Sequence, residues 1–176
     1  MKRLLLIVLP LLLIVGCSKP ISEETLIDKD GLKYHPETKE LYSGEVFKNY
    51  MGGEKEFEGS YMEGEKDGLW TGWYENGNKR SEKTFKDGTL DGLWILWHEN
   101  GQKMVERTFK NGKGEGLVTA WYETGQKKRE WTLKDGLEQG LWIEWYDNAQ
   151  KKSEANYKDG SQISKREWNE DGSVKE

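Results

Sequence analysis

The chain has 176 residues, of which 34% are charged and 34% are hydrophobic, and its formal net charge is −5. The negative charge argues against a nucleic-acid partner, because proteins that bind nucleic acid present a basic face. Low apolar content alone favours disorder, but nine Trp and eight Tyr recur at regular spacing, which predicts a folded chain instead.

The beginning of the chain is typical of a signal peptide. Lys2 and Arg3 precede an apolar run over residues 4–15, which is interrupted only by Pro10. This run is too short for an ordinary transmembrane helix. We therefore assign residues 1–16 to a targeting segment that does not belong to the fold.

The end of this segment, Ile14-Val15-Gly16-Cys17, resembles a bacterial lipobox. The resemblance implies cleavage before Cys17 and acylation of its thiol, and two or more acyl chains anchor a protein stably. The alternative is an ordinary signal peptide that happens to contain a cysteine. Cys17 is the only cysteine, so an internal disulfide is excluded.

A chain lipidated in this way would be anchored in the bacterial cell envelope. Because Ser18 and not Asp follows the cysteine, the resemblance implies the outer membrane if the bacterium has two membranes. Residues 17–30 are polar and are expected to form a short lipidated tether. Residues 31–43, GLKYHPETKELYS, are expected to form a hairpin that caps the first repeat.

A stretch that begins at Gly68, GLWTGWYENGNKRSEKTFKDG, recurs three times, and each copy starts 24 residues after the one before. A period between 20 and 50 residues indicates a repeat architecture. A weaker copy precedes these four and a truncated one follows them. We therefore predict five repeats over residues 44–163 and a truncated repeat or C-terminal cap over residues 164–176.

Each repeat is predicted to be a hairpin. Residues 69–74 are rich in aromatic and β-branched side chains, which favour a strand, and residues 79–86 form a polar strand whose apolar residue is Phe85. Asn76-Gly77 between them predicts a type I′ turn. Asn148-Ala149 replaces this pair in the fourth copy and should give the least ideal turn.

Alternate side chains of a strand face opposite sides, so Leu69, Thr71 and Trp73 share one face, and Trp70 lies on the other face with Tyr74. Repeats stacked in register would form aromatic ladders on both faces. A lone hairpin is marginal in water, and each unit therefore depends on its neighbours. The predicted fold class is all-β, an elongated single-layer antiparallel β-meander built from 24-residue hairpin repeats.

No pattern of residues indicates a catalytic or metal site. His98 occupies a position that tyrosines hold in other copies, and His35 has no second ligand at metal-binding spacing. The acidic residues beside the turns are too few at each turn for a calcium loop. We predict no enzyme activity, no cofactor and no metal. The basic cluster over residues 126–129 is expected to be a solvated face, with a phosphate or acidic-lipid site as the alternative.

The repeated pattern G-L-W-x-x-W-Y-E-N-G-Q-K-K, followed by K-D-G, resembles the variant MORN repeat and the bacterial YwqK-type antitoxins. The segment Leu41-Tyr42-Ser43-Gly44-Glu45-Val46 resembles the opening of the first repeat in that family. The resemblance covers about residues 31–172. It implies a MORN-like repeat scaffold and a role in neutralising a toxin by binding it.

The predicted function is that of a non-catalytic lipoprotein whose repeats act as a protein-interaction scaffold with an antitoxin-like or immunity-like role. Its partners would be the membrane, through Cys17, and a protein such as a toxin; no oligomeric state is indicated. The alternative is a cell-wall or carbohydrate-binding surface protein, since aromatic faces suit sugar rings and quaternary amines. Aromatic side chains are favoured at interfaces, and the candidate partner-binding residues are Trp70, Trp73, Tyr74, Trp94, Trp97, Trp121, Tyr122, Trp142, Trp145 and Tyr146.

Overall fold

The computed structural model describes residues 19–175. The predicted signal peptide and the lipidation site at Cys17 lie outside the described residues. The elements, in chain order, are β1 (Ile21–Ser22), the 3-10 helix η1 (Glu23–Thr25), β2 (Ile27–Lys29), β3 (Leu32–Tyr34), β4 (Gly44–Asn49), β5 (Lys55–Met62), β6 (Glu65–Trp73), β7 (Lys79–Lys86), β8 (Thr89–Trp97), β9 (Lys103–Lys110), β10 (Lys113–Trp121), β11 (Lys127–Lys134), β12 (Leu137–Trp145), β13 (Lys151–Lys158) and β14 (Ser161–Glu167).

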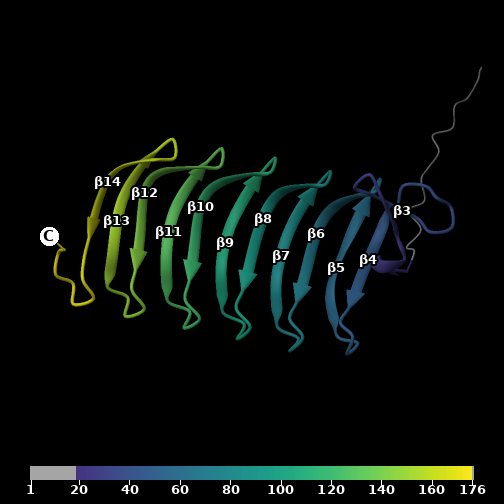
Figure 1. The fold of residues 1–176 in the computed structure, drawn as a ribbon, viewed down its shortest axis with the longest axis horizontal. Helices are drawn as coiled ribbons and strands as arrows, with labels where there is room; N and C mark the ends of the chain where they lie inside the picture. Colours follow the sequence, from purple (N-terminus) through teal and green to yellow (C-terminus); the bar gives the residue numbers. More distant parts are fainter. Residues whose placement is uncertain (1–18, 176) are drawn as a thin grey trace, which may run out of the picture.

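One long sheet makes up most of the molecule. It contains 12 strands in the order β1-β4-β5-β6-β7-β8-β9-β10-β11-β12-β13-β14, and β2 and β3 form a separate two-stranded sheet. From β4 onward each strand pairs in antiparallel fashion with the next strand in the chain, and the hairpins stand side by side in a single layer (Figure 1). The predicted all-β meander of hairpin repeats is confirmed.

The turns after β6, β8, β10 and β12 differ from the prediction. The Gly77 N–H donates to the Tyr74 carbonyl at 3.0 Å, and the Tyr74 N–H donates to the Asn78 carbonyl at 2.9 Å. Within this loop only Gly77 has a positive φ, of 82°. This geometry is a three-residue loop, a type I turn followed by a left-handed residue, and the predicted type I′ turn at Asn76-Gly77 is wrong.

Type I′ turns occur at the opposite ends of the strands instead. Lys86 pairs with Thr89, and both residues between them have positive φ, 46° at Asp87 and 71° at Gly88. Two left-handed residues in succession are what a type I′ turn requires. The prediction for the fourth repeat is confirmed, because Ala149 carries a φ of 64° at the position that Gly77 fills in the first.

A bulge in each repeat sets the direction of one large side chain. Thr71 pairs with Glu58 and Asp67 pairs with Ser60, so that three residues of β6 lie opposite Gly59 alone. The bulge turns the Trp70 indole over Gly59, where any Cβ atom would overlap the ring. The indole N–H donates to the Ser60 carbonyl at 3.0 Å. Bulges are a common means of re-aiming a side chain.

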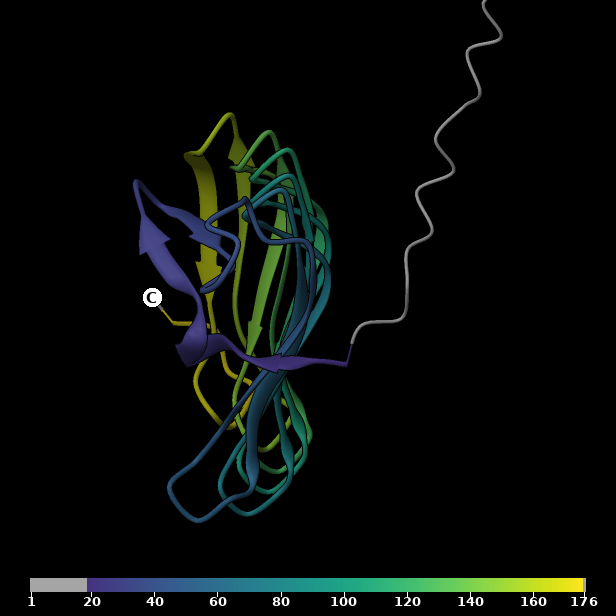
Figure 2. The same cartoon turned by 90° about the vertical axis from the view of Figure 1, so that its right-hand side faces the viewer.

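The N-terminal segment covers one face of the sheet at its first strands. Strand β1 pairs in parallel with β4, and Leu26, next to η1, joins a buried cluster with Tyr42, Val46, Tyr61 and Trp70. Figure 2 shows this segment on one side of the bent sheet. Ordered elements therefore begin at Ile21, within the range expected as a tether. Residues 31–43 form a hairpin as expected, because Tyr34 bridges to Leu41 in antiparallel fashion and the Tyr42 N–H donates to the Lys33 carbonyl at 2.9 Å. Strand β2 pairs with β3 as well.

The other end of the sheet is less enclosed. Strand β14 pairs only with β13, within residues 19–175, and most of its side chains are exposed. Beyond it, the chain turns once more between Asn169 and Ser173, with the same hydrogen-bond pattern as the Gly77 turn. This segment corresponds to the truncated repeat predicted for residues 164–176.

Candidate interaction surface

The sheet has two faces, which we name by one tryptophan each. The Trp70 face carries the residues that pair in register with Trp70, such as Lys83, and it is the face that Leu26 covers at the N-terminal end. The Trp73 face carries Leu69, Thr71 and Trp73. The predicted alternation along residues 69–73 is thus observed.

Lysine, glutamate and tryptophan alternate in regular rows on the Trp73 face. The Lys79 ammonium lies 2.5 Å from the Glu82 carboxylate and 5.9 Å from the centre of the Trp97 ring. The same ion pair recurs once per repeat, in Lys55–Glu58, Lys103–Glu106, Lys127–Glu130 and Lys151–Glu154. Exposed ion pairs stabilise little, but these pairs leave the charges of the rows balanced.

An apolar row runs beside them on the same face. Leu69, Leu93, Leu117 and Leu141 take equivalent positions, and 43–56% of the surface of each is exposed. The tryptophans Trp73, Trp97, Trp121 and Trp145, which the sequence predicts as binding residues, are half-buried. The Trp73 face therefore presents apolar groups at regular intervals over four repeats.

The predicted binding tyrosines connect successive repeats. The Tyr74 hydroxyl donates to the Trp97 carbonyl at 2.7 Å, and Tyr122 and Tyr146 make the same bond to Trp145 and Trp168. His98, in the same position, places Nε2 at 3.2 Å from the Trp121 carbonyl. These residues lie at the sheet's turn edge, and their polar atoms serve the fold.

The Trp70 face carries an aromatic ladder that is interrupted once. Trp70 contacts Phe57 and Tyr61, with ring centres 5.6 Å and 5.1 Å apart, and Trp94 contacts Phe109 at 5.4 Å. Trp142 continues the ladder with Tyr157 at 6.4 Å. Val118, fully buried, stands at the corresponding position of the third repeat. Trp70 is itself buried and belongs to the core of the molecule.

Cations lie over the rings of this ladder. The Lys66 ammonium is 4.2 Å from the centre of the Trp70 ring, and the Arg107 guanidinium is 3.7 Å from that of Trp94. Lys83 lies 5.1 Å from the same Trp94 ring. Cation–π contacts of this kind favour the charged side chain by about 0.5–2 kcal/mol, more where water is excluded.

The electrostatics of these cations are unfavourable. Burial, and then the nearby Lys83, lower the pKa of the Lys66 ammonium, and burial, followed by Arg80 and Arg107, lowers the pKa of Lys83. The charged forms of Lys66 and Lys83 are therefore less stable than in water, and a neighbouring anion would stabilise them.

Farther along the same face the positive charges are neutralised. Burial alone would raise the pKa of the Glu144 carboxyl, but hydrogen bonds from Arg129 and Lys152 outweigh burial and lower it. Both cations lie 3.3 Å from one Glu144 oxygen. The cations at Glu144 are thus neutralised, whereas Lys66, Lys83 and Arg107 on β6–β9 are in no ion pair within residues 19–175.

The sequence missed these cations as candidate binding residues. The polar strands that carry Lys66, Lys83 and Arg107 are expected from the sequence to be solvated. No periodic motif identifies these cations either, because the residues at the position of Lys83 differ in every repeat. Only the register of the strands shows that they converge on the aromatic rings.

Two further observations concern metal ligands and helices among the described residues. Within residues 19–175 no three side chains of His, Cys, Asp or Glu gather in a way that could hold a metal ion. No helix in this part of the chain has the length and apolar character needed to cross a bilayer.

The fold and its surfaces define a class, a single-layer sheet of hairpin repeats that presents side chains on two faces. Four stretches of the chain match the family described as MORN repeat variant, at residues 66–87, 90–111, 114–135 and 138–159. Together they make up half of the sequence, and each begins in the first strand of one hairpin and ends in its Asp-Gly or Asn-Gly turn. The chain belongs to the MORN repeat variant family. No curated protein matches it.

Proposed function

We propose that this MORN repeat sheet is the partner-binding part of a non-catalytic lipoprotein of the bacterial envelope, with an antitoxin-like or immunity-like role. The resemblance to YwqK-type antitoxins supports a protein as the partner, and the lipobox at Cys17 supports anchoring in the membrane. A toxin met at the envelope, exported or incoming, fits such a location.

The observation that carries the proposal is the apolar row of the Trp73 face. Four leucines, each about half exposed, lie in line beside half-buried tryptophans, and Lys19 and Pro20 line a hollow beside the first of them, Leu69. Continuous exposed apolar patches usually mark interaction sites. A sheet that offers such a row across four hairpins suits a partner with an extended, complementary surface.

The occupied rings favour a protein over a glycan. Sugar rings and quaternary amines bind to open aromatic faces, but lysines already lie 5.2–5.9 Å from the centres of the Trp73, Trp97 and Trp121 rings. The cell-wall alternative would require these lysines to move away from the rings.

A lipidated Cys17 would hold the sheet close to the membrane. Cys17 precedes the first residue of β1, Ile21, by four residues, and four extended residues span at most about 14 Å. A partner on a lipidated chain would therefore be held at the membrane surface.

The test is site-specific photo-crosslinking in native membranes. A photoreactive residue at position 93, in the apolar row, should capture one protein, and the same residue at position 51, in an exposed turn, should not. Leu117→Asp, in the same row, should abolish the capture at position 93. Equal capture at both positions, or capture that Leu117→Asp leaves unchanged, would refute the proposal.

The anchor has a separate test. Mass spectrometry of the mature N-terminus should find an acylated Cys17, and Cys17→Ser should release the protein from the membrane fraction. An unmodified thiol at the mature N-terminus would exclude the lipoprotein assignment and leave the interaction surface as a separate question.

A further inference from the structure

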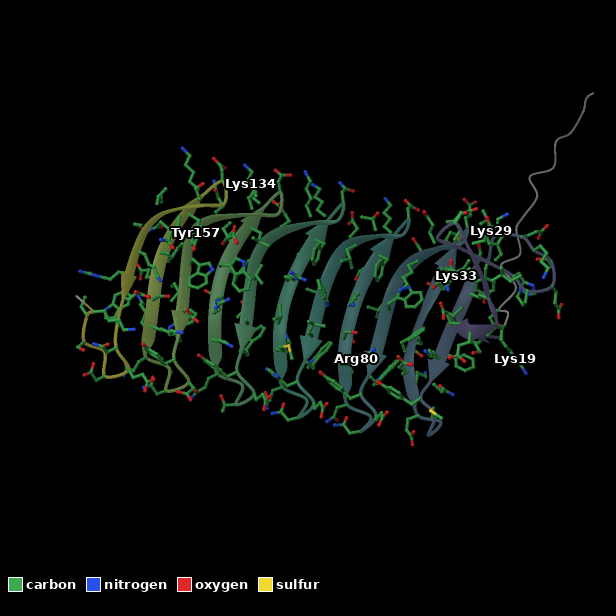
Figure 3. All side chains as sticks on the ribbon, viewed as in Figure 1. Lys19, Lys29, Lys33, Arg80, Lys134 and Tyr157 are labelled. Atoms are coloured by element: carbon green, nitrogen blue, oxygen red, sulfur yellow. The ribbon has the colours of Figure 1, made fainter. Side chains whose placement is uncertain are left out.

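A small hollow opens on the Trp70 face between β6 and β7. Its volume is about 140 Å³, and the rings of Phe57, Trp70 and Phe85 form its apolar walls. Lys66, Arg80 and Lys83 line it as well, and no carboxylate does. Figure 3 shows Arg80 near the turn end of β7.

None of these cations forms an ion pair in the described part of the chain, and the Glu23 carboxylate raises the pKa of Lys66 only against the larger effect of burial. Among the ion pairs within residues 19–175, none includes Lys66, Arg80, Lys83 or the nearby Arg107. On the opposite face, by contrast, a glutamate neutralises one lysine in every repeat. The chain as a whole is negative, so this concentration of positive charge is a local feature.

Buried polar atoms beside the hollow also lack partners. Arg107 Nε and Trp94 Nε1 are inaccessible to solvent and make no hydrogen bond within the described part of the chain. Buried donors of this kind are rare in folded proteins. Both atoms belong to the hairpin β8–β9, adjacent to the hollow.

We propose that this hollow binds a carboxylate side chain of an acidic protein segment, which crosses β6–β9 and places a further acidic group near Arg107. The inference goes beyond the proposed function, because the hollow lies on the face opposite the apolar row. Three cations around one small hollow suit a carboxylate, and charge-assisted hydrogen bonds are the strong ones in proteins.

The same geometry argues against other anionic ligands. Nucleic-acid bases bind by stacking on open aromatic faces, whereas Lys66 and Arg107 already lie over the rings of Trp70 and Trp94. A flat bilayer is kept away, because the N-terminal segment projects from this face at one end of the sheet (Figure 2). A single peptide chain can reach the hollow beside that segment.

The test is calorimetric titration of the full chain in a non-ionic detergent. The probe is a peptide of ten glutamates, and a peptide of ten glutamines is its matched control. The double variant Arg80→Gln, Lys83→Gln removes two charges from the hollow, and Lys79→Gln, Lys103→Gln removes two charges from the opposite face. Arg80→Gln alone, near the end of its strand, provides a milder variant if the double variant unfolds.

We expect the glutamate peptide to bind and the glutamine peptide not to bind. The double variant in the hollow should weaken binding by about tenfold or more, and the variant on the opposite face by no more than about twofold. Equal weakening by both double variants would mean that the peptide senses only net charge, and it would overturn the proposal.

Two further titrations separate the other ligand classes. The ligands are phosphatidylglycerol in mixed micelles of the same detergent and a ten-residue oligothymidine. Either ligand would overturn the assignment if it bound more tightly than the glutamate peptide and lost affinity in the hollow variant alone. Leu117→Asp should leave peptide binding unchanged. Failure of the photo-crosslinking experiment together with successful peptide binding would refute the proposed function and leave the carboxylate site standing.

Discussion

The Tyr74 hydroxyl donates a hydrogen bond to the main-chain carbonyl of Trp97, 2.7 Å away and one repeat farther along the chain. Trp97 ends strand β8, so the bond ties the turn of one hairpin to the strand end of the next. The equivalent bonds of Tyr122 and Tyr146 extend this linkage along the sheet. A residue conspicuous as a binding candidate in the sequence thus couples neighbouring repeats.

The first prediction concerns this bond. Tyr74→Phe removes the hydroxyl and leaves the Trp97 carbonyl without its partner, which should lower the free energy of unfolding by about 1 kcal/mol. Chemical denaturation followed by tryptophan fluorescence measures the change. The matched variant His98→Tyr restores the consensus residue and should not destabilise the protein. Unchanged stability in Tyr74→Phe would show that the bond contributes nothing.

The second prediction concerns the turn after β12. Ala149 adopts a left-handed φ of 64°, which costs a residue with a Cβ atom about 1 kcal/mol relative to glycine. Ala149→Gly should therefore raise the melting temperature. Gly77→Ala makes the reverse change at the equivalent position and should lower it by a similar amount. Changes of the same sign in the two variants would contradict the turn geometry.

The third prediction concerns the contact between Gly59 and Trp70. A Cβ atom at position 59 would overlap the indole ring, which is fixed by its hydrogen bond to the Ser60 carbonyl. Gly59→Ala should destabilise the protein by about 2 kcal/mol, as overpacking does. Gly52→Ala is the control, since a Cβ atom there meets only the movable end of the Glu54 side chain. Equal unfolding free energies for the two variants would refute the packing argument.

The fourth prediction concerns pH. Burial, followed by Arg80 and Arg107, lowers the pKa of Lys83 below 10.5, so between the lowered pKa and 10.5 the unfolded chain binds more protons than the folded one. Stability therefore rises with pH through this window. Lys83→Met removes this increase of the unfolding free energy with pH. The unfolding free energy of the variant minus that of the natural chain should therefore be greatest at pH 7 and should fall toward pH 10. Urea titrations at the two pH values measure the difference, which would be constant if Lys83 were fully solvated.

The fold was predictable because its signals are local and repeated. Aromatic strand residues at a 24-residue period and a glycine at each turn predict stacked hairpins, and even the weak turn at Ala149 follows from one substitution. Type I′ geometry was predicted at Asn76-Gly77 and is found at Asp87-Gly88, because both dipeptides are compatible with it. Loop length decides between them, and it depends on strand register rather than on the turn residues alone.

The candidate surfaces were only partly predictable. The alternation along Leu69, Thr71 and Trp73 identified one face correctly, because it follows from the geometry of a single strand. The charges around Trp70 could not be found in the same way, because Lys66, Arg80 and Lys83 come together only through the bulge and the pairing of β6 with β7. Pairing between strands depends on residues far apart in the sequence, so the pattern within one strand does not predict it.

The buried cluster formed by Leu26, Val46, Tyr61 and their neighbours makes the two ends of the sheet unequal in local stability. The N-terminal segment packs on the first strands of the sheet. Strand β14, by contrast, has one neighbouring strand and mostly exposed side chains. Thermal fraying should therefore start at the C-terminal hairpin and proceed toward the N-terminal strands, so that amide protons of β13 and β14 exchange with solvent before those of β4 and β5. A protein partner that binds the last hairpins would slow this local unfolding. A partner that binds only the first hairpins would leave its rate unchanged.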